Sequence, residues 1–224
     1  MRHIQGIVVV NEPDLLQRAV DSVEPLWENA FILDNSPGGW IGRDRRWPVP
    51  VVRPSVPLSV AQSLNFLQRL AREAGADVFF FQHNDAEAQP GSAMRFLQTV
   101  QEHFDAASRW ATVFTHYDIL SAYHVAAVND IGDWDTAFPQ PNYHIDNDWF
   151  HRARLKGYEL TETGIAVTHH NGASSTLRGS DLRRRVNDVT FPMNEEYYRR
   201  KWGGPPGGEV YASAWNCNFD LERE

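Results

Sequence analysis

The chain has 224 residues, of which 42% are apolar and 22% charged, and its formal net charge is −8. This composition is that of a folded globular protein, and the acidic balance argues against a surface whose main task is gripping nucleic-acid phosphates. No stretch approaches the ~20 apolar residues of a transmembrane helix, so we expect no membrane span. A single cysteine, Cys217, excludes an internal disulfide, and no signal-peptide pattern opens the chain, so we expect a cytoplasmic location.

Strand-like and helix-like patterns alternate over the first 104 residues. Apolar runs predict strands at residues 4–10, 30–33, 49–52 and 78–81. Helical spacing of apolar residues predicts helices that begin near Pro13, after Ser59 and after Pro90. This alternation is typical of a doubly wound α/β sheet flanked by helices.

The regular alternation of strand and helix patterns does not continue in the second half of the chain. We expect short strands at residues 111–114 and 119–120 and a short helix over 124–131. A Pro-rich aromatic loop then leads to a helix at about 146–156 and a final strand at 165–168. Residues 177–201 are charged and partly helical.

The most informative stretch follows the strand at 78–81, where the apolar run stops at Gln82-His83-Asn84-Asp85-Ala86-Glu87. Open α/β sheets place their sites at the carboxyl ends of buried strands. His83 and Asp85 are two residues apart and share a side while the backbone stays extended. Carboxylate oxygens are ligands for hard divalent cations, and the plainer alternative is a polar loop after a core strand.

Three further places combine polar groups with an element end. Asp34 closes the second strand, where an Asx-turn with Ser36 is the structural alternative. Asp146 begins a helix, and the dipole of a helix lowers the pKa of a carboxylate at its start. Asp146 is a candidate base, and simple N-capping of the helix is its alternative role. His169 and His170 end the last strand and face opposite ways, so one of them is a candidate metal ligand while the other packs or meets solvent.

Six motifs in order resemble those of family 2-type glycosyltransferases with the GT-A fold, over roughly residues 4–202. They are Asp34-Asn35-Ser36, Ala61 to Asn65, His83-Asn84-Asp85 with Pro90-Gly91, Gly132-Asp133-Trp134-Asp135, Asp146-Asn147-Asp148 with Arg152 and Gly157-Tyr158, and His170-Asn171-Gly172 with Lys201-Trp202-Gly203. The sequence departs from the family pattern at His83, where a carboxylate or Asn is usual, and at Ile145, where Glu is usual.

The resemblance implies a single GT-A domain with a mostly parallel sheet, in which residues 1–104 bind a nucleotide sugar, 105–176 form the acceptor and catalytic half, and 177–224 are an extension. It implies that the chain transfers a sugar from a nucleotide diphosphate, with a UDP-sugar favoured, to an acceptor hydroxyl of a saccharide, a protein or a hydroxylated DNA base. Mn²⁺ or Mg²⁺ is the implied cofactor, and inversion the implied stereochemistry. The resemblance implies a metal ligand at Asp85, together with either His170, which its spacing to Gly172 favours, or His169. It implies nucleotide contacts at Asn11, Asp34, Asn65, His83 and Asn84. The implied base is Asp146 or, less favoured, Asp148.

Two other classes stay open at this point. A catalytically impaired nucleotide-sugar or carbohydrate-binding module fits the two departures from the family pattern. A nucleotidyltransferase shares the α/β sheet and the carboxylate–metal chemistry. It would normally carry a Gly-rich phosphate loop after the first strand, where this chain has Asn11-Glu12-Pro13-Asp14.

Overall fold

The computed structural model describes residues 1–37, 41, 46–170 and 180–217. Its centre is a seven-stranded sheet with the order β3-β2-β1-β4-β7-β6-β8. The strands are β1 (His3–Val9), β2 (Ala30–Asp34), β3 (Val51–Val52), β4 (Val78–His83), β6 (Trp110–Phe114), β7 (Leu120–His124) and β8 (Glu159–Glu162). Neighbouring strands are parallel except β7, which runs antiparallel to both β4 and β6.

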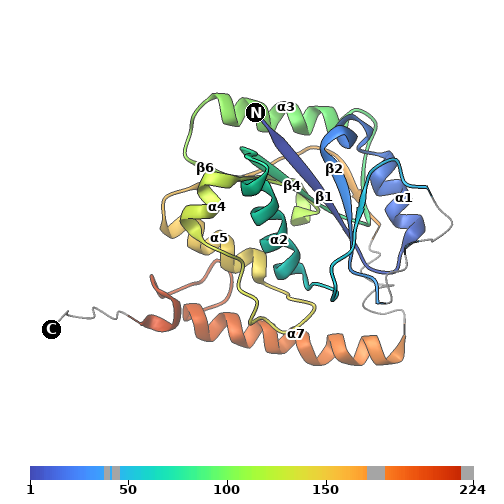
Figure 1. Cartoon of the computed structure of the whole chain (residues 1–224). Coiled ribbons are helices and arrows are strands. Elements are labelled where there is room, and N and C mark those ends of the chain that lie inside the picture. The colour runs from blue at the N-terminus through green and yellow to red at the C-terminus, as the bar shows by residue number, and fades with distance from the viewer. Residues whose placement is uncertain (38–40, 42–45, 171–179, 218–224) are drawn as a thin grey trace.

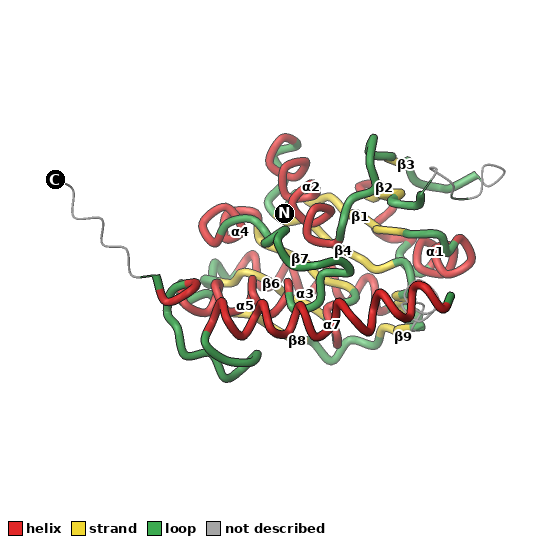
Figure 2. Tube along the Cα trace, turned by 90° about the horizontal axis from the view of Figure 1, so that it is seen from below, coloured by secondary structure: helices red, strands yellow, loops and turns green. Residues whose placement is uncertain are grey.

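Helices cover both faces of this sheet (Figure 1). One face packs on α2 (Val60–Glu73), α4 (Val125–Ile131) and α5 (Ile145–Leu155), and the other on α1 (Pro13–Asp21) and α3 (Ser92–Asp105). The 22-residue helix α7 (Asp181–Trp202) packs beyond α5 and is the foremost helix when the molecule is viewed from below (Figure 2). None of the described helices combines the length and apolar character that crossing a membrane requires.

The apolar side chains of β4 pack into the hydrophobic cores on both faces of the sheet, as the unbroken apolar run in the sequence predicts. Phe79 and Phe81 belong to the cluster that contains α2, whereas Val78 and Phe80 belong to the cluster under α3. All four side chains are at most 3% exposed. Because full burial of such a side chain stabilises a fold by about 1.5–3 kcal/mol, β4 anchors the sheet on both faces and fixes the position of the residues that follow it.

The predicted α/β fold is confirmed, and the strands from both halves of the chain form one sheet through the β4–β7 pairing. Two strands were not predicted, β5 (Ala86–Ala88) and β8. The strand expected at 165–168 is β9 (Val167–His169), which does not join the main sheet but pairs antiparallel with β5. Gln82 helps to hold β5 there, because its buried amide donates to the carbonyl of Ala86 at 2.9 Å.

Candidate functional site

The candidate residues gather at one edge of the sheet. In the parallel ladders Val9 pairs with Asp34 and Val8 with His83, so β1, β2 and β4 end at the same level. The antiparallel strand β7 begins at this edge, because Leu120 pairs with Gln82. The segments after β1, β2 and β4 and the segment before β7 therefore surround a common area.

Asp34 is buried and both of its carboxylate oxygens have partners. Oδ1 accepts a hydrogen bond from the backbone N–H of Ser36 at 3.0 Å, which is the Asx-turn anticipated from the sequence. Oδ2 accepts one from Nε of Arg53 at 3.1 Å, a contact that the sequence did not suggest. Asn11 joins this group through its backbone N–H, which donates to Oγ of Ser36 at 2.9 Å. Hence Asn11 and Asp34, both expected to contact nucleotide, are adjacent.

Asp85 and His169 meet directly after β4. Asp85 is 4% exposed, and its Oδ2 lies 3.2 Å from Nε2 of His169. That nitrogen is buried but its geometry makes no hydrogen bond. A buried imidazole nitrogen without a hydrogen bond beside a carboxylate oxygen is a donor pair that suits a divalent transition-metal ion such as Mn²⁺ better than Mg²⁺, which prefers oxygen ligands.

His83 and Asn84 flank this pair. Nδ1 of His83 lies 4.0 Å from Oδ1 of Asp85, and its ring packs edge-on against His169. Burial lowers the pKa of His83, more than the neighbouring Asp85 raises it, so the imidazole is held neutral. Asn84 lies half-buried in the turn between β4 and β5.

His170 points away from Asp85. Its Nε2 lies 2.5 Å from Oε2 of Glu87, which also lies 4.0 Å from Arg18, while its backbone N–H donates to the carbonyl of Asp85. The side chain of Asp85, which lies in the turn before β5, therefore meets His169, whereas Glu87 of β5 meets His170. The spacing to Gly172 had favoured His170, whereas the structure places His169 beside the carboxylate. Gly172 itself lies outside the described residues.

Over the described ranges, no group of three or more His, Cys, Asp or Glu side chains is arranged to hold an ion. This does not exclude the pair of Asp85 and His169 as metal ligands. Mg²⁺ sites that act on phosphates typically use one or two protein carboxylates and complete the shell with substrate oxygens and water. The donor set thus fits an ion that arrives with a diphosphate.

Asp146 lies half-buried in the first turn of α5. Burial raises the pKa of its carboxyl above the ordinary value, although nearby backbone N–H groups act in the opposite direction. The sequence had suggested a lowered pKa from the helix dipole, and burial outweighs that effect. Asp118 is a neighbour that sequence reasoning missed: burial, and then the charge of Asp146, raise the pKa of Asp118 well above normal.

Asp148 is fully buried in an ion-pair network. Its Oδ1 forms an ion pair with Nζ of Lys201 at 2.6 Å and accepts a hydrogen bond from Nε1 of Trp202 at 2.8 Å. Its Oδ2 accepts a hydrogen bond from Nε of Arg152 at 3.0 Å. Lys201 also contacts Oδ2 of Asp135 at 2.7 Å. This network holds the end of α7 against α5. It also engages both carboxylate oxygens of Asp148, the less favoured of the two candidate bases.

Asn65 has a comparable role between α2 and the loop after α4. Its Nδ2 donates to the carbonyl of Trp134 at 2.9 Å, and its Oδ1 accepts from the N–H of the same residue at 2.8 Å. These two bonds hold the side chain of Asn65 against the backbone of Trp134. The structure thus brings together Asn11, Asp34, His83, Asn84, Asp85 and His169, and gives Asn65 and Asp148 bonds within the fold.

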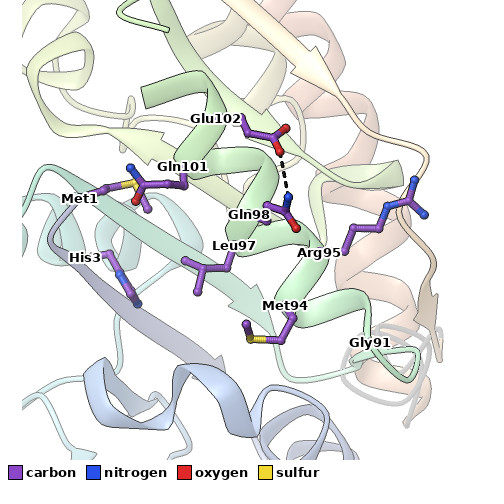
Figure 3. Close-up of a pocket in the computed structure, with 9 residues that line it drawn as sticks. All are labelled: Met1, His3, Gly91, Met94, Arg95, Leu97, Gln98, Gln101 and Glu102. Carbon is purple, nitrogen blue, oxygen red and sulfur yellow. Dashed lines mark hydrogen bonds between the residues drawn. The ribbon is translucent and has the colours of Figure 1, made fainter. Parts of the chain in front are cut away.

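Two surface hollows lie elsewhere. One, of about 650 Å³, lies between α3 and the start of β1, where His3 and Leu97 line it together with Met94 (Figure 3). The other, of about 700 Å³, lies between α2 and residues 133–136 and includes Asn65. Neither contains Asp34, Asp85 or Asp146.

Comparison with known proteins gives structural matches only. No protein-family model and no curated protein matches the sequence. A mannosyltransferase from Pyrobaculum calidifontis, solved in complex with GDP-mannose and Mn²⁺, matches with a TM-score of 0.64 and 14% identity, over 93% of this chain and 67% of that one. TarS of S. aureus matches with a TM-score of 0.54 and 9% identity, over 75% of this chain and 36% of that one. The chain therefore has the fold of GT-A glycosyltransferases.

Proposed function

We propose that the protein is a metal-dependent glycosyltransferase that moves a sugar from a nucleotide diphosphate to an acceptor hydroxyl with inversion. The observation that carries this proposal is the convergence of Asp34, Asp85 and His169 at the carboxyl edge of a GT-A-like sheet. The complex of the mannosyltransferase neighbour with GDP-mannose and Mn²⁺ supports the same chemistry.

Each residue has a defined task in this mechanism. Asp34 accepts a hydrogen bond from the nucleotide base, with Asn11 beside it. Asp85 and His169 would hold Mn²⁺ or Mg²⁺, which neutralises charge on the diphosphate leaving group when bound. Asp146 accepts the proton of the acceptor hydroxyl as that oxygen bonds to the anomeric carbon and the bond from this carbon to the diphosphate breaks. The raised pKa of Asp146 makes it a stronger proton acceptor than an exposed carboxylate.

The test is a panel of UDP- and GDP-sugars incubated with the protein and Mn²⁺, with release of nucleoside diphosphate as the readout. We favour a UDP-sugar, and the panel includes GDP-sugars because the neighbour binds GDP-mannose. Turnover that requires both Mn²⁺ and Asp85 supports a transferase. Binding without turnover in any combination indicates a binding module instead, and release of pyrophosphate from a nucleoside triphosphate indicates a nucleotidyltransferase.

A further inference from the structure

The loop between β6 and β7 holds two consecutive residues in an unfavourable backbone conformation. Tyr117 and Asp118 have φ values of 58° and 47°, in the left-handed region that L side chains rarely adopt. Thr115 and Leu120 close this loop through backbone and side-chain hydrogen bonds, and Oγ of Ser121 donates to the carbonyl of Asp118 at 2.8 Å. The loop is therefore held in one shape, and that shape decides where the two side chains point.

The Tyr117 ring is 68% exposed, so burial does not explain the strained backbone that carries it. Its centroid lies 4.0 Å from that of His116 and 6.3 Å from that of His169. The same loop contacts β4, because the carbonyl of Ile119 accepts from the N–H of His83 at 3.0 Å. An aromatic face thus borders the site on the side of His169.

Asp118 lies near enough to Asp146 for the charge of Asp146 to add to the effect of burial, which raises the pKa of Asp118. The loop therefore carries one residue near the candidate metal ligand His169 and one near the candidate base Asp146. In the proposed reaction the acceptor hydroxyl must reach both Asp146 and the anomeric carbon next to the diphosphate. Tyr117 and Asp118 are therefore suited to contact such an acceptor.

We propose that Tyr117 stacks on the pyranose ring of a saccharide acceptor and that the carboxyl of Asp118 hydrogen-bonds its hydroxyls, an inference that rests on the proposed function. Aromatic faces pack on the C–H face of sugars, and a carboxyl group offers two oxygens to neighbouring hydroxyls. A net charge of −8 disfavours an acceptor within DNA, because it repels phosphates.

Saturation-transfer NMR with the methyl pyranosides of glucose, galactose, mannose and N-acetylglucosamine tests this inference, with UDP and GDP plus Mg²⁺ as separate probes. The variants are Tyr117→Ala, Tyr117→Phe and, as control, Trp215→Ala. Trp215 is also an exposed aromatic residue with a positive φ, of 62°. We expect wild type, Tyr117→Phe and Trp215→Ala to bind at least one glycoside, and Tyr117→Ala to bind it about three- to tenfold more weakly, the effect of one lost aromatic contact.

The nucleotide probes separate this inference from the proposed function. If wild type binds UDP or GDP but no glycoside, or if Tyr117→Ala binds the glycoside as tightly as wild type, the acceptor role of Tyr117 is wrong while the transferase proposal stands. If Tyr117→Ala loses nucleotide affinity instead, the ring belongs to the donor pocket and the inference is wrong. If no variant binds either nucleotide, the transferase proposal itself fails, whatever the glycosides show.

Discussion

Nε2 of His169 and Oδ2 of Asp85 lie 3.2 Å apart without a hydrogen bond between them, and both groups are largely removed from solvent. A buried imidazole nitrogen without a hydrogen bond is unfavourable unless another group binds it. A divalent cation that enters with the donor diphosphate would bind this nitrogen together with the neighbouring carboxylate oxygen. Metal binding by this pair is therefore the first proposal to test.

The first prediction concerns the two histidines. We expect His169→Ala and Asp85→Asn each to weaken Mn²⁺-dependent binding of UDP or GDP by at least about tenfold, since each removes a ligand. His170→Ala leaves the Asp85–His169 pair in place and should change the affinity by less than about twofold. Calorimetry with and without Mn²⁺ measures all three, and a larger loss in His170→Ala than in His169→Ala would reverse the assignment.

The histidine pair shows what the sequence could and could not predict. Alternation along a strand correctly indicated that His169 and His170 face opposite ways. It could not say which one meets Asp85, because that depends on how β5 pairs with β9. The closest paired residues, Ala88 and Val167, are 79 positions apart in the chain. β5 has three residues and no apolar run, so its sequence gave no signal of a strand.

The second prediction concerns the nucleotide pocket. Asp34→Asn retains an oxygen for the turn bond to Ser36 but removes the charge that faces Arg53 and the acceptor capacity for the base. We expect donor affinity to fall by ~1–3 kcal/mol, the range for a lost hydrogen bond at a buried site, with little change in Tm. Equal affinity of variant and wild type for UDP and GDP in calorimetry would reduce Asp34 to a turn residue.

The third prediction uses the raised pKa of Asp118. A carboxyl whose pKa is higher in the folded than in the unfolded state lowers stability as pH rises above its unfolded pKa of about 3.9. Asp118→Asn removes this penalty, so its Tm should exceed that of wild type at pH 7–8, and the difference should shrink towards pH 4. Asp105→Asn, at an exposed position, serves as control. A Tm difference for Asp118→Asn that does not depend on pH would contradict the assigned environment.

Motif order in the sequence identified elements that the structure uses, but not what each polar residue contacts. Lys201-Trp202 and Asp148 are both recognisable as motif residues in the sequence. The hydrogen bond between Trp202 and Asp148, however, joins two residues that are 54 positions apart in the chain. No local pattern encodes such a pairing. Asp118 carried no signal either, because a single Asp in a short loop after a strand is typical of solvent-exposed turns.

The fourth prediction concerns the buried network. Lys201→Met leaves Asp148 with one fewer cation in a site where it is fully buried, so we expect a loss of about 3 kcal/mol in the free energy of unfolding. The neighbouring Arg200→Met breaks only an exposed pair with Glu196 and should cost at most ~1 kcal/mol. Urea unfolding followed by tryptophan fluorescence measures both. Equal losses in the two variants would mean that the Lys201 network does not hold α7 to α5.

The last prediction separates the two acidic residues of α5. Asp146 is half-buried near Asp118, whereas Asp148 is enclosed by Lys201, Arg152 and Trp202. Asp146→Asn keeps the shape of the side chain but cannot accept the acceptor proton. We therefore expect its kcat for transfer to fall by ~10²–10⁴-fold while donor affinity and Tm stay near wild type. Asp148→Asn should show the opposite pattern, with a lowered Tm from the weakened network.

The stereochemistry of the product completes this test. A base that deprotonates the acceptor for direct displacement gives inversion, which NMR of the anomeric proton in the product reads directly. A product with the donor's anomeric configuration, or normal kcat in Asp146→Asn, would exclude Asp146 as the base. Loss of kcat with unchanged Tm in Asp148→Asn would instead transfer the catalytic role to the buried carboxylate, and would require the Lys201 contact to open during turnover.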